Sequence, residues 1–518
     1  MALGPDKRAG WWLGLAVTVA ALAVYLATLA PTLTFQHYGA DGGDLIAAAH
    51  TLGVPHPPGY PTYTVLAWLA SHLPIGNIAY RVNLLSAICA AGSVGLLCMT
   101  TQVLLASHRA SRLVACSAAL TLGFSSLLWS QAVIGEVYAP LMLFASLFLF
   151  LLVRWRAGGS DTTLWLAAFC LGTGLGVHLT LAFALPPAIA LLWTQRQRWL
   201  RSRTLLPALA LFVAGLGVYA YLPLAASHHP PVNWGDPDRW DRFVWVISGR
   251  LYQPLVLGLP PGERVARLGS WARLVGNQFG WWGLAIAFLG APVWWKRDRS
   301  LALFGLLWAS LTAVYAFFYD SADSFVYLLP AMLLLAVSWS QGGRYLLDVA
   351  GNLRPWAQPA ASAILLLLPA GSLALHWSEA DLGGDWSAQA YVDRVLASIA
   401  PNGLVLAQSE MPTFGLWYAQ YTDGQRPDIA VVNTSLLGFD WYRAQLRGTY
   451  PQLEVPDPLA EAANVDDQVR ELVVRNYLRH PAYATDPSDA WKAWCDVVQE
   501  GGGSVYRIQI KAKWEPAR

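Results

Sequence analysis

Apolar runs of about 20 residues recur along the first 376 residues of this 518-residue chain. As a helix rising about 1.5 Å per residue, one such run crosses the roughly 30 Å hydrocarbon core of a bilayer. Only 13% of the residues are charged and 55% are hydrophobic, whereas an ordinary soluble domain is about 25% charged. A soluble core cannot bury that much apolar surface, so the sequence predicts a mainly α, polytopic membrane protein.

The runs predict about eleven transmembrane helices within a membrane module at residues 1–380. The first, from Trp11 to Ala30, follows Lys7 and Arg8. It is longer than a signal-peptide core and lacks a small-residue cleavage site, so we interpret it as a retained helix. The other ten are expected at 82–106, 113–131, 138–153, 163–178, 180–194, 204–224, 281–295, 301–318, 325–340 and 357–376.

Two long loops and a C-terminal domain interrupt or follow these runs. The loop at 31–80 is rich in Gly, Pro and His and holds two short apolar pieces, which suit interfacial or re-entrant helices. A second long loop is expected at 225–280. From Asp381 the composition becomes ordinary, and strand patterns at 403–408 and 428–433 flank a helical piece. Residues 381–518 are therefore predicted to form a soluble α/β domain.

Basic residues predict the orientation because short loops rich in Lys and Arg stay in the cytoplasm. They concentrate in alternate connections, for example Arg196, Arg198, Arg201 and Arg203 in one of them. This pattern predicts a cytoplasmic N-terminus and places both long loops and the C-terminal domain outside. The net charge of +2 and the lack of a basic patch argue against a nucleic-acid partner. The five cysteines form neither a disulfide framework nor a metal-ligand spacing.

The densest group of polar residues is HYGADGGDLIAAAHTLGVPHPPGYP at 37–61. Asp41 and Asp44 stand three residues apart, just ahead of a short helix. Asp44 is either a helix N-cap or a functional acid. Asp41 is harder to explain by capping, and ionisable groups at membrane depth are functional candidates. The glycines between them are expected to let a substrate approach the backbone closely.

The other candidate residues share predicted outside positions next to the apolar runs: His56, Tyr60, Arg81, Glu136, Tyr138, His178, Asn233, Trp234, Asp236 and Arg250. The prolines of the turn at 56–61 either only shape the loop or hold His56 and Tyr60 against a ligand. Arg81 either snorkels to the interface or binds a phosphate. The aromatic residues at 230–252 either form an interfacial belt or stack on sugar rings, and Arg250 is a second phosphate candidate.

Several blocks in this order resemble a known family. They are the DGGD stretch with LGVPHPPGYP, RVNLLSA, WSQAVIGEVYA, HLT, VNWGDPDRWDRFVWVISGRLY and a late VYLLP, which span most of residues 35–335. The chain resembles bacterial relatives of the eukaryotic transmembrane protein O-mannosyltransferase that modifies plexin-type receptor domains, within the GT-C glycosyltransferase superfamily. RPDIAVVN and WYRAQL in the tail are also similar to the outside domain of that family.

The resemblance implies an inverting glycosyltransferase in a bacterial cytoplasmic membrane. It would move a sugar, with mannose as the candidate, from a polyprenyl-phosphate carrier to a protein, glycan or lipid hydroxyl on the outer side. Asp41 matches the family's first acidic position and is the implied base, while Asp44 and Glu136 would complete the catalytic set. The chain departs from the family where a Ser has become Gly42, a Glu has become Asp44, and Val177 stands in place of Asn.

A different function class remains open at this stage. A polytopic transporter or flippase of a lipid-linked or small polar substrate would show a similar set of spans. Transporters often contain internal repeats and midplane ionisable residues, and neither is evident in this sequence. A scaffold whose tail binds envelope partners is a third reading. No cofactor is certain beyond the lipid-linked donor, no residues are proposed as metal ligands, and membrane lipids and an acceptor are the expected partners.

Overall fold

The computed structural model describes residues 5–105, 110–456 and 464–515, and the chain forms two compact units. One, which we call the helical unit, contains Met1–Leu29, Asn83–Tyr219 and Leu251–Gly383. The other, which we call the mixed unit, contains Ala30–Val82, Ala220–Arg250 and Gly384–Arg518. The mixed unit therefore combines the tail with both loop regions in which the sequence predicts functional residues. The predicted boundary at residue 381 stays a prediction.

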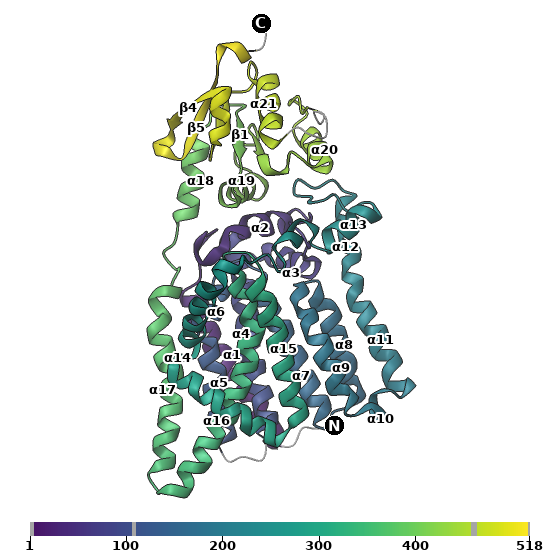
Figure 1. The fold of residues 1–518 in the computed structure, drawn as a ribbon, viewed down its shortest axis with the longest axis vertical. Coiled ribbons are helices and arrows are strands. Elements are labelled where there is room, and N and C mark those ends of the chain that lie inside the picture. The colour runs from purple at the N-terminus through teal and green to yellow at the C-terminus, as the bar shows by residue number, and fades with distance from the viewer. Residues whose placement is uncertain (1–4, 106–109, 457–463, 516–518) are drawn as a thin grey trace. The chain divides into compact units, whose positions relative to one another are not determined.

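The helical unit is built almost entirely from α-helices and short 3-10 helices (Figure 1). Its α-helices, including α4, which begins in the mixed unit, are α1 (Pro5–Ala27), α4 (Ile78–Leu104), α5 (Ser111–Gly123), α6 (Ser126–Ala132), α7 (Tyr138–Arg156), α8 (Asp161–Leu175), α9 (Leu185–Trp193), α10 (Arg196–Trp199), α11 (Ser202–Leu216), α14 (Arg264–Arg297), α15 (Arg299–Phe318), α16 (Leu329–Leu353) and α17 (Ala357–Ala380). The 3-10 helices are η2 (Leu179–Ala184), η3 (Gly217–Ala220), η4 (Arg250–Leu255), η5 (Pro261–Glu263) and η6 (Ser324–Leu328).

Seven helical segments in the described part of the chain are long and apolar enough to cross a membrane. The number rises to eight if α5 and α6, which meet at a bend of 67°, count as one span. Of the eleven expected spans, that at 163–178 corresponds to α8, which has 15 residues, and that at 180–194 to the shorter apolar helix Leu179–Trp193. The span expected at 281–295 lies inside α14, which continues through a kink at Gly280. The polytopic helical class is confirmed, although several predicted spans are short or bent.

Helices α14 and α16 pack with their backbones in close approach. A Cβ atom at Gly290 of α14 would overlap the backbone of α16 at Ser338. The Ser338 hydroxyl donates a hydrogen bond of 2.7 Å to the carbonyl oxygen of Ala287 in α14. Small residues and interhelical hydrogen bonds of this kind hold membrane helices together where burial of apolar surface gives little driving force.

The mixed unit contains short helices and one small sheet. Its helices are η1 (Gln36–Asp41), α2 (Gly42–His50), α3 (Pro61–Ser71), α12 (Tyr221–Ala226), α13 (Trp240–Ile247), α18 (Ser387–Ser398), α19 (Glu410–Tyr421), η7 (Thr434–Leu436), α20 (Asp440–Thr449), α21 (Val465–Asn476), η8 (Asp489–Ala493), η9 (Gly501–Gly503) and η10 (Ala512–Trp514). The two short helices expected in the first loop are confirmed as α2 and α3. The segment expected as a loop at 225–280 is partly helical, because it holds α13 and the first half of α14.

The sheet has the strand order β2-β1-β3-β5-β4. Its strands are β1 (Leu404–Ala407), β2 (Ala430–Asn433), β3 (Ala482–Ala484), β4 (Cys495–Glu500) and β5 (Val505–Ile510). Strand β1 pairs in parallel with β2 and β3, and β5 runs antiparallel to β3 and β4. Strands β1, β2 and β3 are buried along their whole length, and their sequences are short runs of mostly apolar residues. Both features are expected of parallel strands that are covered on both faces of the sheet. The predicted strand–helix–strand pattern is confirmed by β1, α19 and β2.

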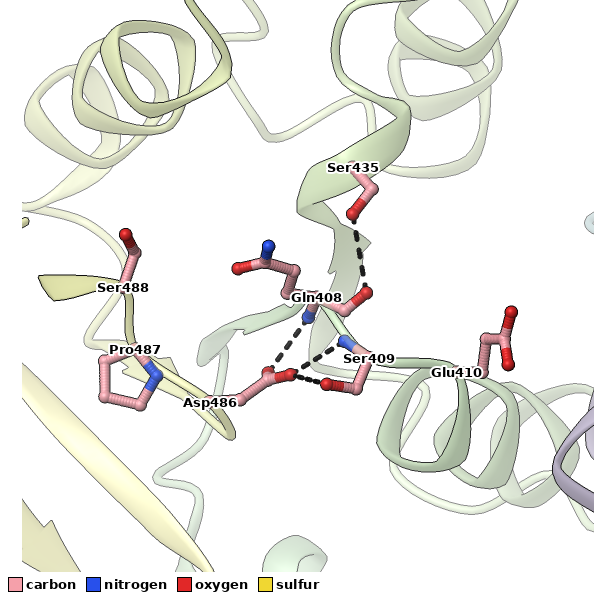
Figure 2. A pocket seen from close by; sticks show the side chains of 7 residues that line it. All are labelled: Gln408, Ser409, Glu410, Ser435, Asp486, Pro487 and Ser488. Atoms are coloured by element: carbon pink, nitrogen blue, oxygen red, sulfur yellow. Dashed lines mark hydrogen bonds between the residues drawn. The ribbon is translucent and has the colours of Figure 1, made fainter. Parts of the chain in front are cut away.

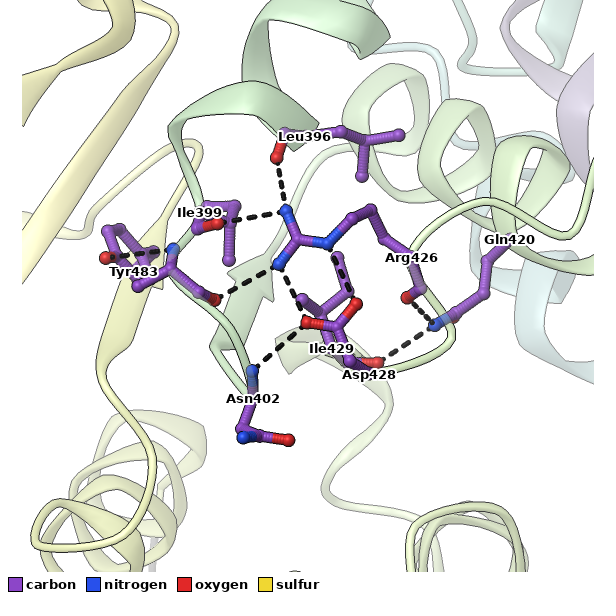
Figure 3. Close-up of polar contacts among 9 residues, drawn as sticks. Leu396, Ile399, Asn402, Gln420, Arg426, Asp428, Ile429 and Tyr483 are labelled. Atoms are coloured by element: carbon purple, nitrogen blue, oxygen red, sulfur yellow. Dashed lines mark hydrogen bonds and ion pairs between the residues drawn. The ribbon is translucent and has the colours of Figure 1, made fainter.

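Arg426 ties the end of α18 to the start of β2 (Figure 3). Its guanidinium donates to the carbonyl oxygens of Leu396 and Ile399 at 2.6 and 2.9 Å. It also forms a two-point pair with Asp428, with both N–O distances at 2.8 Å. The carbonyl groups at a helix C-terminus have no partner within the helix, and an arginine supplies donors for them. The hydrogen bond from Arg426, against the smaller effect of burial, lowers the pKa of Asp428 to about 2.

Candidate active site

Asp44 lies in the first turn of α2 and is fully buried. One carboxylate oxygen, Oδ2, accepts hydrogen bonds from the His56 backbone N–H at 3.0 Å and from His56 Nδ1 at 2.8 Å. The other oxygen, Oδ1, accepts from the Trp234 indole N–H at 2.8 Å. A buried carboxylate needs such donors to offset the loss of its hydration. Asp44 therefore acts as an anchor for His56 and Trp234, and the N-cap interpretation of its side chain is wrong.

His56 lies between the two acids of the loop. Its Nδ1 donates to Asp44, because the ionised carboxylate only accepts, and its Nε2 lies 3.6 Å from Oδ2 of Asp41. The imidazole is 5% exposed, whereas the Asp41 side chain is 34% exposed. The series Asp44, His56 and Asp41 thus runs from a fully buried carboxylate to one that solvent or a substrate can reach. The imidazole thus faces Asp41 from the protein side, and the Asp41 side chain is partly exposed.

Trp234 reaches Asp44 from 190 residues away in sequence. Its segment pairs with the first loop, since Val54 N–H donates to Val232 at 2.9 Å and Trp234 N–H donates to Val54 at 3.0 Å. The indole is 5% exposed and lies 6.1–6.3 Å, between ring centroids, from the rings of Phe414, Trp417 and Trp441. Burial among aromatic rings fits an anchoring residue better than a platform for sugar stacking.

Gly43 lies where α2 meets α19. A Cβ atom at this position would overlap the backbone of Phe414. This glycine is thus needed for contact between two elements of the protein. The expected close approach of a substrate to the backbone stays a prediction. Phe414 also stacks on His56, with ring centroids 6.5 Å apart and an angle of 11° between the ring planes. Helix α19 therefore supports the acidic loop from the tail of the chain.

Tyr60 directly precedes α3 and adopts a left-handed backbone conformation with φ of 38°. Left-handed conformations are unusual for residues with a side chain and need support from their surroundings. Its ring makes an edge-to-face contact with His56, with centroids 5.1 Å apart. The proline-rich turn therefore places His56 and Tyr60 side by side. Whether the turn holds them against a ligand stays a prediction.

Asn233 and Asp236 belong to a polar chain that continues through Arg242. The Asn233 amide donates to Asp236 at 2.9 Å, and Arg242 donates to Asp236 at 2.6 Å and to Asp440 at 3.0 Å. The Asn233 amide oxygen is buried and accepts no hydrogen bond within the described residues. A buried acceptor without a donor is costly. The Asn233 amide oxygen is therefore the acceptor of this chain whose hydrogen-bonding capacity is unused within the described residues.

The two candidate phosphate-binding arginines, Arg81 and Arg250, differ in whether their guanidinium groups already donate hydrogen bonds within the protein. Arg81 donates to the carbonyl oxygens of Ser71, Ile75 and Gly76 at 2.7–2.9 Å, so it holds the turn after α3. Arg250 is exposed, and within the described residues its guanidinium makes no hydrogen bond or ion pair. Of the two, Arg250 keeps its donors available.

Glu136, Tyr138 and His178 lie in the helical unit. Glu136 is 3% exposed, and one of its carboxylate oxygens accepts from the Val137 N–H at 3.3 Å. His178 caps η2, because its Nδ1 accepts from the Thr180 N–H. The rings of Tyr138 and Tyr327 lie 5.6 and 5.4 Å from that of His178. Tyr138, His178 and Tyr327 thus form an aromatic cluster. The predicted roles of Glu136, Tyr138 and His178 stay predictions.

A polar pocket of about 640 Å³ lies at the carboxyl ends of β1, β2 and β3 (Figure 2). Such ends commonly bind ligands where the strand connections diverge. Here, however, Asp486 accepts from the N–H groups of Gln408 and Ser409 at 2.9 and 2.7 Å. This carboxylate occupies the place at the start of α19 that an anion would take. The pocket therefore offers no evident phosphate site.

Sequence reasoning missed Arg242, Phe414 and the anchoring role of Trp234. Each depends on a contact between segments that are far apart in the chain. The only local signal is the unusual density of Trp, Asp and Arg at 234–242. Among the residues with described positions, no group of three or more His, Cys, Asp or Glu side chains has the arrangement of a metal site.

Comparisons with known proteins agree with the sequence resemblance. Residues 41–202 match the family model described as the Protein O-mannosyl-transferase TMEM260 N-terminal domain, and residues 388–503 match TMEM260-associated domain 2. Protein O-mannosyl-transferase TMEM260 of Mus musculus is 27% identical over 480 residues, covering 87% of this chain and 67% of the relative. The relative of the same name from Dictyostelium discoideum is 21% identical, covering 84% of this chain and 58% of the relative. The chain thus spans about two thirds or less of these relatives.

Solved structures support the fold assignment. The crystal structure of ArnT from Cupriavidus metallidurans bound to undecaprenyl phosphate has a TM-score of 0.58 at 14% identity, over 98% of this chain and 99% of that one. Its apo state has a TM-score of 0.54, also at 14% identity, over 99% and 100% of the two chains. Identity this low supports the fold alone. The family matches, in contrast, confirm the prediction of a glycosyltransferase over that of a transporter. The chain is an integral membrane protein that carries TMEM260 protein O-mannosyl-transferase domains on the fold of the GT-C glycosyltransferases.

Proposed function

We propose that this glycosyltransferase transfers mannose, with inversion, from a polyprenyl-phosphate carrier to a hydroxyl group of a protein. The carrier class is supported by the fold shared with ArnT, which was crystallised with undecaprenyl phosphate. The sugar and the acceptor class are supported by the names of the relatives. The alternation of basic connections supports an N-terminus in the cytoplasm and action on the outer side. The resemblance to bacterial relatives supports a bacterial cytoplasmic membrane.

The observation that carries the mechanism is the graded burial of Asp44, His56 and Asp41. Asp41 is the partly exposed end of the series, and its geometry is supported by an imidazole that the buried Asp44 holds in place. In the proposed step, Asp41 takes the proton of the acceptor hydroxyl as that oxygen attacks the anomeric carbon. The bond from this carbon to the phosphate oxygen breaks, and the polyprenyl phosphate leaves with the electron pair. His56 is a positioning residue for Asp41.

Neighbouring groups have separate proposed roles. Arg250 stabilises the charge on the leaving phosphate, because its guanidinium is exposed and not neutralised by a carboxylate. The Asn233 amide oxygen accepts a hydrogen bond from a substrate hydroxyl. Asp44 and Trp234 act by holding the loop. Glu136, Tyr138 and His178 remain candidates for contacts to the donor or acceptor.

The purified full chain should transfer mannose from polyprenyl-phosphate mannose to a serine- or threonine-containing acceptor domain. Nuclear magnetic resonance of the product should show an anomeric configuration opposite to that of the donor. A product with retained configuration would refute the single-displacement mechanism. Transfer from a nucleotide sugar in the absence of lipid carrier would refute the proposed donor class.

A further inference from the structure

A pocket of about 340 Å³ lies in the helical unit, at one end of its helices. Its walls come from the ends of α4 and α7, the junction of α14 and α15, and α16. Its lining includes none of the candidate catalytic residues. The connections around it are the basic ones that predict the cytoplasmic side. Its volume is within the usual range for a small-ligand site, about 300–1,000 Å³.

The two arginines of this pocket differ in their ion pairs. Arg156 forms a two-point pair with Asp298, at N–O distances of 3.1 and 2.8 Å. Asp298 also caps α15 by accepting from the Leu301 N–H at 3.0 Å. Both oxygens of the Asp298 carboxylate therefore already accept hydrogen bonds, from Arg156 and from the start of α15. Arg297 forms no ion pair within the described residues, and its one hydrogen bond there, to Gln341, is long at 3.4 Å.

Further donors without acceptors line the same pocket. The Trp294 side chain is 6% exposed, and its indole N–H has no hydrogen-bond partner among the residues with described positions. Gln195 contributes an amide that makes no hydrogen bond among the described residues. Burial and the nearby Arg344 lower the pKa of Arg297, against the opposing effects of Asp298 and Asp348. Within the described residues, an unpaired indole donor and an arginine without an ion pair thus gather around this space.

The rest of the wall is apolar and includes Val103, Leu104, Val153 and Leu301. A soluble anion gains nothing from such a surface, whereas a lipid places its phosphate at the donors and its glycerol and chain carbons against the apolar wall. Basic pockets between transmembrane helices on the cytoplasmic side are suited to anionic headgroups. We propose that this pocket binds the phosphate headgroup of an anionic membrane phospholipid, with Arg297 as the principal contact.

Native mass spectrometry of the purified full chain tests this proposal, with phosphatidylglycerol as the probe and phosphatidylcholine as the zwitterionic comparison. The wild-type chain should retain phosphatidylglycerol more strongly. Arg297→Gln should weaken that binding about tenfold, because a charge-assisted hydrogen bond is lost. The matched control is Arg354→Gln, which changes an exposed arginine in the connection between α16 and α17. It should leave the affinity unchanged.

Three outcomes would overturn the proposal. If Arg354→Gln weakened phosphatidylglycerol binding as much as Arg297→Gln, the lipid would be attracted to basic residues in general and not to this pocket. Displacement of the lipid by millimolar inorganic phosphate, dependent on Arg297, would show a site for a free anion. If Arg297→Gln fails to fold, Gln195→Ala takes its place and should weaken binding about threefold, so unchanged affinity would count against the pocket. The readout is lipid binding, so it is independent of whether mannose transfer is observed.

Discussion

Two hydrogen-bonded networks of the mixed unit contain carboxylates, and they differ in whether one of those carboxylates can also contact a substrate. Around Arg426, the guanidinium donates to carbonyl oxygens and to Asp428, and both partners are tied to backbone that joins α18 to β2. Around His56, the buried Asp44 is equally well satisfied, but the series ends at Asp41, which is 34% exposed. The first network is suited to stability alone. The second couples a stable anchor to a carboxylate that can meet a substrate.

The largest effect should follow from Asp44→Asn. An amide in place of this carboxylate turns one acceptor into a donor that faces the His56 and Trp234 donors, and it removes a buried charge that both rely on. We expect a loss of about 3–5 kcal/mol in the free energy of unfolding, as for other broken buried polar pairs. Both the temperature of thermal unfolding and the rate of mannose transfer should fall. A variant with wild-type thermal stability would show that Asp44 is not an anchor.

The two ring nitrogens of His56 can be separated by substitution. His56→Asn keeps a donor near the position of Nδ1 and should preserve folding, but it removes the group that faces Asp41. We expect kcat to fall about tenfold with little change in KM for the acceptor. His56→Gln keeps a polar group nearer to Nε2 and should lose thermal stability instead. Equal behaviour of the two variants in both assays would contradict the positioning role.

Asp428→Asn should affect stability without affecting transfer. Its pair with Arg426 is about one third exposed and screened by solvent, so we expect a loss of about 1 kcal/mol. In the wild type the pKa of Asp428 is lowered to about 2 from an ordinary value near 3.9. Its contribution is therefore complete above pH 4 and is lost as the pH falls toward 2. Acid unfolding monitored by hydrogen exchange in the mixed unit should show this component only in the wild type.

The smallest effect is expected from Arg250→Gln. This side chain is exposed, and the phosphate it is proposed to meet is partly solvated, so the KM for the lipid donor should rise only severalfold. Arg239→Gln, which changes another exposed arginine of the same unit, is the matched control. If the KM for the lipid donor rose equally in both variants, Arg250 would contribute only to the general positive charge of the unit.

Local sequence patterns predicted much of this fold. Long apolar runs predicted the membrane helices, and the apolar strands of 403–408 and 428–433 predicted the parallel part of the sheet. The pattern failed where helices are short or kinked, as at Gly280, because hydrophobicity alone does not report bends. For the site, the acids and the HPPGYP turn were recognised from sequence.

The internal order of the site was not predictable from one sequence. The capping interpretation of Asp44 was reasonable from its position before an apolar run. It is wrong because the side chain instead accepts from His56, 12 residues later, and from Trp234, 190 residues later. The same holds for Gly43, whose partner Phe414 lies in the tail. Contacts at such separations have no local signal.

The rate of mannose transfer by Asp41→Asn, measured against the matched variant Asp238→Asn, tests the central claim most directly. The two carboxylates lie in the same unit and are similarly exposed, at 34% and 39%. If Asp41 is the base, its loss should reduce kcat at least 100-fold with unchanged thermal stability, as for other general bases. Asp238→Asn should keep the wild-type rate. Transfer by Asp41→Asn at the rate of that control would contradict the proposed mechanism.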